Sequence, residues 1–333
     1  MKNNRIEWID FLRGVVILLV VIGHINSGLM GSESFQTHEE ILSYLHNFFR
    51  SFRMPIFFVI SGFLYATKIN HSFGELKNSL KKKLIALGIP YIVFSVLIWW
   101  LKYFMGDNVN RILTWSDLYL LPIRPFGRFW FLYVLFLIYA IVEILDYIFK
   151  NNFIVFIILL CATICGWYFC SDIFIVDKTL SMILYFYLAK LMRINIDFVK
   201  SKVFIALGIL TFIILQIIGI DNSHKGIDFV VAISISLSAI VLCSRIKNEN
   251  KIFKYFSLIG KSTLPIFLLN PSIASAVRIF LLKIGINNLF LHYTIGIVIT
   301  WYFSIFIYHL ASKNKYTDFL FYPLRYVKIE TNN

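Results

Sequence analysis

Long runs of apolar residues constrain the fold of this chain more than any other feature. In FIVFIILLCATICGWYF, residues 153–169, no charged residue interrupts the run. A helix needs about 20 such residues to cross a bilayer. Hydrophobic residues make up 59% of the sequence and charged residues 15%, whereas a soluble domain is about half apolar and about a quarter charged. The sequence therefore predicts an all-α polytopic membrane protein.

We expect about ten transmembrane helices and no separate soluble domain, so that residues 1–333 form a single transmembrane domain. The first apolar stretch is not expected to be a cleavable signal peptide, because Asp10 and Arg13 interrupt it and no small-residue cleavage site follows. The predicted spans are residues 9–27, 52–67, 84–104, 129–148, 152–170, 178–194, 202–220, 227–244, 262–282 and 290–311.

The formal charge of +14 follows a topological pattern. If the N-terminus is cytoplasmic, the predicted inner segments hold 21 of the 32 Lys and Arg residues and the outer segments hold ten. This bias fits the positive-inside rule with both termini in the cytoplasm. The basic charge thus indicates topology and contact with anionic membrane lipids, and we do not expect a nucleic acid partner.

Three polar side chains interrupt the first span, IDFLRGVVILLVVIGHI, at Asp10, Arg13 and His24. A charge within the bilayer is costly unless it faces protein or water. At about 100° per residue, Arg13 and His24 differ in direction by about 20°, and Asp10 and His24 by about 40°. The three side chains therefore share one face of the helix.

Two interpretations of this polar face remain open. In one, Asp10 and Arg13 form an ion pair near the membrane interface, and His24 is a hydrogen-bonded core residue. In the other, the face is a polar path across the membrane, with His24 as proton acceptor or nucleophile. Imidazole suits that task because it takes up and returns a proton near neutral pH.

A second polar signal lies in NFFRSFRMPIFFVISGFLY, residues 47–65. Pro55 suits the first turn of a helix, so we expect this helix to begin near residue 52. Arg53 enters an apolar run, which predicts a buried partner. Arg50 lies one turn earlier, so both cations can face one site at the outer mouth, although Arg50 can also reach lipid headgroups. Ser61, farther along, is a further candidate for binding.

Other polar positions give weaker signals. His292 and His309 lie near the ends of the last predicted span, where we expect them at the membrane interface. The cysteines lack His or carboxylate neighbours in the sequence, so we expect buried apolar thiols and no metal site; they are Cys161, Cys165, Cys170 and Cys243.

The first two polar stretches together resemble the acyltransferase-3 family of membrane proteins, which includes acetylases of cell-surface sugars. That family begins with an Arg, ten residues and a His, matched here by Arg13 and His24, and its second helix reads much like SFRMPIFFVISGF. Weaker matches follow in the family's order, and they are LKKKLIALGIPYIVFS (80–95), RFWFLYVLFLIYA (128–140) and GKSTLPIFLLNP (260–271).

This chain departs from the family pattern at two positions. Many relatives carry a His where this chain has Asn270, and Asn hydrogen-bonds but does not titrate. The expected role of Asn270 is therefore ligand contact or structure. A His is also common among relatives at the position of Arg53, so a cation or donor is kept there.

The resemblance implies transfer of an acyl group, most simply acetyl, from cytoplasmic acyl-CoA to a hydroxyl of an extracytoplasmic or lipid-linked polysaccharide. Under this hypothesis His24 is the base or a transient acyl carrier. Arg13 orients the thioester end or pairs with Asp10. The expected location is a bacterial cytoplasmic membrane, and the acyl-CoA is a donor substrate rather than a bound cofactor.

The remaining candidates are an arginine, an aromatic pair and three lysines, and the last two groups each have an alternative structural role. Arg128 is expected to line the site with Arg50 and Arg53, because a cation near the thioester carbonyl stabilises the oxyanion. Trp130, with Tyr133, offers an aromatic face for a sugar ring or belongs to the interfacial belt. The CoA phosphates are expected at three lysines that also serve as topology determinants, namely Lys81, Lys82 and Lys83.

A different class of function also accommodates ten spans and buried arginines, namely an exporter or flippase of a glycan or lipid-linked sugar. A transporter of neutral glycan has little need of a titratable group beside Arg13. A signalling or scaffold protein would leave the buried charges unexplained.

Overall fold

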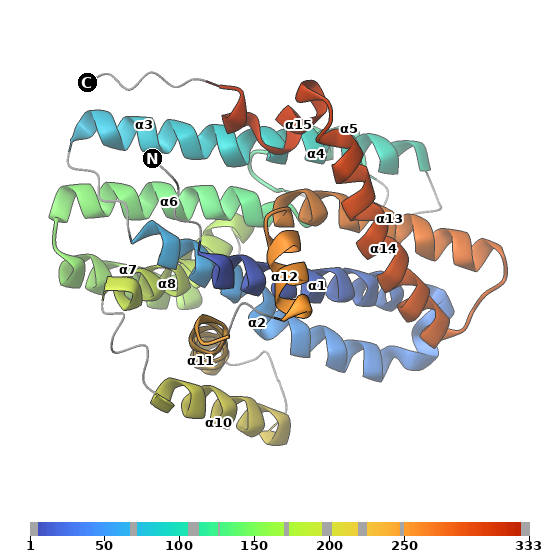
Figure 1. Ribbon diagram of the computed structural model, residues 1–333, viewed down its shortest axis with the longest axis horizontal. Coiled ribbons are helices and arrows are strands. Elements are labelled where there is room, and N and C mark those ends of the chain that lie inside the picture. The colour runs from blue at the N-terminus through green and yellow to red at the C-terminus, as the bar shows by residue number, and fades with distance from the viewer. Residues whose placement is uncertain are drawn as a thin grey trace. The chain divides into compact units, whose positions relative to one another are not determined.

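The computed structural model of the chain consists of helices joined by turns and loops (Figure 1). It describes residues 6–66, 72–105, 113–125, 127–169, 173–194, 202–218, 225–246 and 250–327, and this part of the chain contains no strand. Within it, eight helices are long and apolar enough to cross a membrane. The prediction of an all-α polytopic membrane protein is confirmed.

Each of the ten predicted apolar segments lies on a helix. Two of them fall outside the group of eight, on α8 (Phe174–Ile194) and α10 (Lys202–Ile218). Helix α10 has 17 described residues, slightly fewer than the roughly 20 that a bilayer requires. Helix α8 is long enough but carries four charged residues, Asp177, Lys178, Lys190 and Arg193.

The chain divides into two compact units, and the expected single domain and cytoplasmic termini stay predictions. The first unit comprises Met1–Ile60 and Asn195–His309. It contains α10, most of α2 and α14, and the whole of five further elements. The partly contained helices are α2 (Glu39–Tyr65) and α14 (Leu289–Ala311), and the five complete elements are α1 (Glu7–Met30), η1 (Glu33–His38), α11 (Lys225–Ser244), α12 (Lys251–Gly260) and α13 (Thr263–Lys283).

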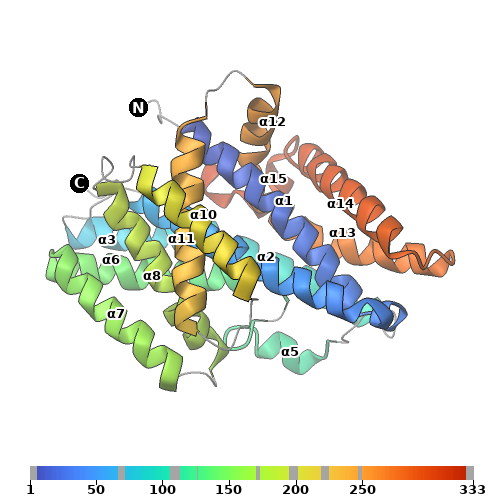
Figure 2. The ribbon, with the colours of Figure 1, turned by 90° about the horizontal axis from the view of Figure 1, so that it is seen from below.

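Helix α1 lies at the centre of the first unit, against α11, α12 and α13 (Figure 2). Its contact with α12 is a close approach of two backbones. A Cβ atom on Gly14 would overlap the backbone oxygen of Phe256, and one on Gly260 would overlap the backbone oxygen of Asp10. Small residues allow helices to approach in this way, so the two glycines fix how closely α1 lies against α12.

The second unit comprises Ser61–Ile194 and Leu310–Asn333. Its helix α6 packs against α3, α7 and α8, and α4 packs against α15. Besides α8, its elements are α3 (Phe73–Lys83), η2 (Leu84–Gly88), α4 (Ile89–Met105), α5 (Trp115–Tyr119), α6 (Trp130–Phe149), α7 (Asn152–Phe169), α15 (Lys315–Phe321) and η4 (Pro323–Arg325).

A polar network stabilises the second unit. The ammonium of Lys190, 5% exposed, donates to Asp146 Oδ1 at 2.7 Å and to Asn152 Oδ1 at 2.9 Å. The hydroxyl of Tyr65 donates to Asp146 Oδ2 at 2.9 Å. A buried charge is tolerated when it is paired and hydrogen-bonded. The network therefore provides hydrogen-bond partners for the buried Lys190 of α8.

The predicted start of the second helix is wrong. Helix α2 begins at Glu39 and continues through Pro55. Its first half is held by packing, since Leu42 is fully buried and its carbonyl accepts a hydrogen bond from Asn26 Nδ2 at 2.8 Å. Proline inside a membrane helix is tolerated where neighbouring groups compensate for the lost backbone bond. Tertiary contacts therefore override the local preference of Pro55 for a first turn.

Replacing Gly14 by Val should destabilise the protein. The two added methyl groups and the Cβ atom meet the backbone of α12 at Phe256, which cannot rotate away. Overpacking of this kind costs about 1–3 kcal/mol. The thermal unfolding midpoint of the detergent-solubilised protein measures the effect. Gly74→Ala, at an open position in α3, is the control, and an unchanged midpoint for Gly14→Val would contradict the close contact.

Candidate functional site

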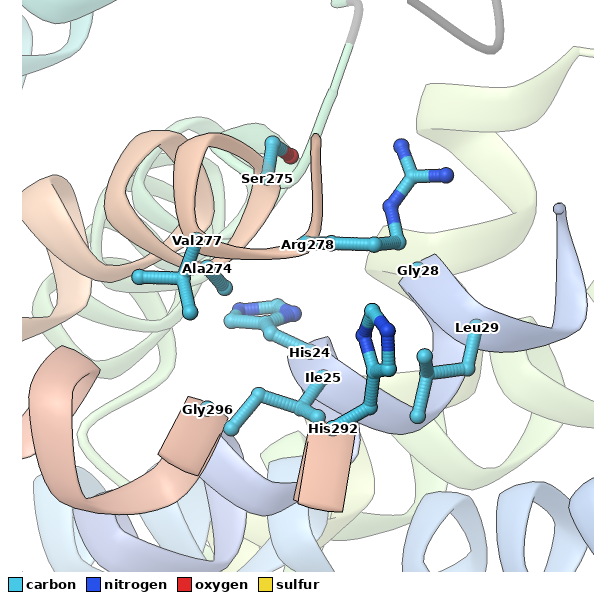
Figure 3. Close-up of a pocket in the computed structure, with 10 residues that line it drawn as sticks. All are labelled: His24, Ile25, Gly28, Leu29, Ala274, Ser275, Val277, Arg278, His292 and Gly296. Atoms are coloured by element: carbon cyan, nitrogen blue, oxygen red, sulfur yellow. The ribbon is translucent and has the colours of Figure 1, made fainter. Parts of the chain in front are cut away.

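His24 lines a small pocket within the first unit (Figure 3). Three helices form its walls: α1, α13 and α14. The space that the centre of a water molecule can occupy is about 20 Å³, enough for one water or a group of similar size. The lining residues are His24, Ile25, Gly28, Leu29, Ala274, Ser275, Val277, Arg278, His292 and Gly296.

Two imidazoles enter this pocket from different helices. Figure 3 shows the ring of His24 reaching from α1 beneath Ala274 and Val277, and the ring of His292 rising from α14. Only 4% of His24 and 2% of His292 is exposed. Two imidazole side chains therefore line one pocket.

His292 is held in a fixed orientation. Its Nε2 lies 2.8 Å from the carbonyl oxygen of Ile286, which only accepts, so Nε2 carries a proton and donates it. The ring of Phe35 packs edge-on at a centroid distance of 4.8 Å. The sequence predicted a position at the membrane interface because His292 lies near a helix end, whereas the structure buries the side chain within protein. This residue of the pocket was therefore missed.

Arg278 was also missed, because no motif marks it. It comes from α13, and its Nε would lie 3.7 Å from a Cβ atom placed on Gly28 of α1. Arg278 is 9% exposed, and its Nε has no hydrogen-bond acceptor among the residues that the structure describes. Arg278 thus lines the pocket near Gly28, and Figure 3 shows the end of its guanidinium pointing away from the two imidazole rings.

The guanidinium of Arg53 contacts α1 at Gly23, the residue before His24. A Cβ atom on Gly23 would overlap Nη1 of Arg53, so Gly23 leaves room for the guanidinium. Arg53 is 5% exposed, as the sequence led us to expect, but its Nε and Nη1 find no hydrogen-bond acceptor within the described ranges. Arg50, one turn away on α2, is exposed. The structure therefore gives the two arginines different environments.

Asp10 and Arg13 form the ion pair that one interpretation anticipated, with Arg13 Nη1 3.9 Å from Asp10 Oδ1. The pair lies about 16 Å along α1 from His24, given the helical rise per residue. Between them on the same face, Ile17 and Val20 are completely buried. The polar face is therefore closed by packing in its middle, and its two ends are separate polar sites.

Asn270 is completely buried but does not line the pocket. Its Nδ2 donates to the carbonyls of Ile266 and Phe267, at 2.9 Å and 3.3 Å. Pro271 has no N–H, so the Phe267 carbonyl loses its usual partner four residues ahead. The side chain of Asn270 replaces that missing donor. This geometry accounts for Nδ2 of Asn270, whereas its Oδ1 is buried without a hydrogen-bond donor among the described residues. A ligand contact by Asn270 stays a prediction.

The other predicted site residues lie in the second unit. Ser61 is buried and Arg128 is half-buried. The ring of Trp130 packs edge-on against Phe174 at 6.2 Å. The ammonium of Lys83 lies 3.7 Å from the ring centre of Tyr139, whereas Lys81 and Lys82 are exposed.

The described residues contain no group of three or more His, Cys, Asp or Glu side chains placed to hold a metal ion. Cys161 and Cys165 are exposed and Cys243 is buried, so the expectation of buried thiols is wrong for the first two, which lie on the outer surface of α7. Cys170 lies outside the described residues.

The fold and the pocket define an integral membrane protein with titratable groups enclosed in its helix bundle. The profile of the acyltransferase-3 family, described as an acyltransferase domain, matches residues 6–309. The chain therefore belongs to this family, as the sequence motifs predicted, and it is a multi-pass membrane protein.

One curated relative matches part of the chain. This relative is nodulation protein NolL of Mesorhizobium japonicum. The chain and NolL are 29% identical over 153 residues, and the alignment covers 43% of this chain and 36% of NolL. The matching stretch is thus little more than a third of the relative. No solved structure matches the chain.

The structural role of Asn270 can be tested with a double-mutant cycle. Asn270→Leu should cost about 1–3 kcal/mol of unfolding free energy, because the Phe267 carbonyl is left buried without a donor. In a Pro271→Ala background a backbone N–H serves that carbonyl, so the same change should cost less. Thermal unfolding of all four proteins measures the coupling. Equal costs in both backgrounds would contradict the proposed pairing.

Proposed function

We propose that the protein moves an acyl group, most simply acetyl, from cytoplasmic acyl-CoA to a hydroxyl of an extracytoplasmic or lipid-linked polysaccharide. His24 serves as the base that deprotonates the hydroxyl, or as a transient carrier of the acyl group. The proposed location is a bacterial cytoplasmic membrane. The observation that carries the proposal is the enclosure of His24 with His292 and Arg278 in a chain of acyltransferase family membership.

The physical case for His24 rests on where its pocket lies. An acyl transfer needs a group that takes a proton from the hydroxyl and a donor that stabilises the negative charge on the carbonyl oxygen. Both act more strongly where water is excluded. His24 is almost fully buried, and cationic side chains lie near it on two sides, with Arg53 beside Gly23 and Arg278 beside Gly28.

The inner end of α1 has a separate part in this proposal. In the predicted orientation, the Asp10–Arg13 pair lies toward the cytoplasm, where the acyl-CoA is found. Arg13 orients the thioester end as the donor enters, before the acyl group reaches His24, and Asp10 holds the guanidinium in place. Lys81 and Lys82, which are exposed on α3, are available for the CoA phosphates. The packed residues Ile17 and Val20 must separate for an acyl group to pass along α1.

Export or flipping of a glycan, the alternative that the sequence left open, has no observation in its favour. The family match is to an acyltransferase domain. The walls around His24 enclose about 20 Å³, which does not accommodate a sugar ring in this state. The acceptor hydroxyl therefore approaches the pocket from outside it.

His24→Ala should lower transfer of radiolabelled acetyl groups from acetyl-CoA to surface glycan by at least about 100-fold, because general base catalysis contributes that much or more. The assay uses membranes of the producing organism with the natural gene replaced by each variant. His309→Ala, at an exposed position on α14, is the matched control. Equal labelling by His24→Ala and the unaltered protein would remove the catalytic role of His24.

Arg13→Gln separates an orienting role from a structural one. Asp10 is only 2% exposed, so removal of its cationic partner should lower the thermal unfolding midpoint. The amide of Gln still donates a hydrogen bond, so we expect the variant to fold. If Arg13 orients the donor, the acetyl transfer rate should nevertheless fall more than about tenfold. Arg245→Gln, an exposed position after α11, is the control. A large loss of stability with a proportionate loss of activity would instead support a purely structural ion pair.

A further inference from the structure

The pocket beside His24 has the two-sided chemistry of an acyl-binding site. One part of its lining is apolar and comes from Ile25, Leu29, Ala274 and Val277. The other part is polar, with Arg278 and two imidazoles. None of the lining residues is acidic. A guest that fits both parts carries an acceptor oxygen at one end and a small alkyl group at the other.

One N–H of Arg278, on Nε, is buried without a hydrogen-bond acceptor among the residues that the structure describes. Arg278 is more than nine-tenths buried, and among the described residues its Nε forms no hydrogen bond. Burial of an unpaired charged donor is costly. None of the lining residues is acidic, so the acceptor proposed for this N–H is a ligand oxygen or a water molecule. A carbonyl oxygen that becomes negative during a reaction is the acceptor that gains most from such a donor.

The size of the pocket limits the group that binds. Its free space of about 20 Å³ matches a methyl group better than a longer chain. Gly28 and Gly296 keep the walls thin, because Cβ atoms at these positions would lie within 4 Å of Arg278 and Ile25. The branched side chain of Val277 lies on the side of the pocket away from Gly28 (Figure 3). Removal of that bulk should admit longer chains.

We propose that this pocket is the acyl subsite, in which Arg278 binds the carbonyl oxygen of the transferred group and Val277 restricts that group to acetyl. This inference rests on the proposed acyl transfer and deepens it. His24 accepts the proton of the sugar hydroxyl as the hydroxyl oxygen bonds to the carbonyl carbon. The resulting oxyanion binds Arg278. The carbon–sulfur bond then breaks, the carbonyl re-forms, and the proton on His24 passes to the CoA thiolate.

Arg278→Gln should lower the rate of acetyl transfer from acetyl-CoA about 100-fold, as loss of an oxyanion donor does. Arg278→Lys should retain part of the activity because it keeps a cation. The assay again uses membranes of the producing organism. Arg245→Gln is the matched control. A rate for Arg278→Gln within about threefold of the unaltered protein would overturn the assignment of Arg278.

Val277→Ala provides a test that survives if the arginine variants fail to fold. The ratio of butyryl transfer to acetyl transfer should rise roughly five- to tenfold, because one or two methylene groups in a pocket change discrimination by that order. Val298→Ala, at an exposed position on α14, should leave the ratio unchanged. An unaltered ratio for Val277→Ala would overturn the acyl subsite.

The two proposals fail in distinguishable ways. If the unaltered protein transfers no acyl group from either donor, the proposed function fails. If it transfers acetyl groups but neither Arg278→Gln nor Val277→Ala has its expected effect, the proposed function stands and the acyl subsite is wrong. In that case a buried water molecule satisfies Arg278 and the pocket is only structural.

Discussion

The first unit is organised by the need to keep polar side chains away from lipid. A charged or polar group within a bilayer is costly unless protein or water surrounds it. His24, Arg53 and Arg278 are each nine-tenths or more buried, and they come from three different helices. Their enclosure requires α2 and α13 to lie close to α1. The same packing that protects these groups from lipid therefore also brings His24 and Arg278 to one pocket.

Glycines along α1 make this packing possible. Gly14 admits the backbone of α12, Gly23 admits the guanidinium of Arg53, and Gly28 leaves space beside Arg278. Side chains at Gly14 and Gly23 would overlap these groups and hold the neighbouring helices away. One helix thus accepts a backbone near one end and two cations near the other. Its apolar middle, with Ile17 and Val20, supplies packing alone.

Much of this arrangement could be predicted from the sequence. The apolar runs predicted the helices, and helical periodicity predicted that Asp10 and His24 share one helix face. Arg278 and His292 could not be found in this way, because they join His24 only after helices far apart in the chain pack together. The early start of α2 was hidden by Pro55, whose local preference is overridden by packing. The role of Asn270 was readable in principle, since Pro271 frees a carbonyl within its reach.

Two of the three walls around His24 are supplied by the last third of the chain. A gene fragment or fusion that ended before residue 263 would keep the Arg-x10-His signature but lose α13 and α14. Its imidazole would remain, with no guanidinium from Arg278 and no second ring from His292. Detection of the signature is therefore insufficient for assigning chemistry to truncated genes in this family. The downstream helices have to be checked as well.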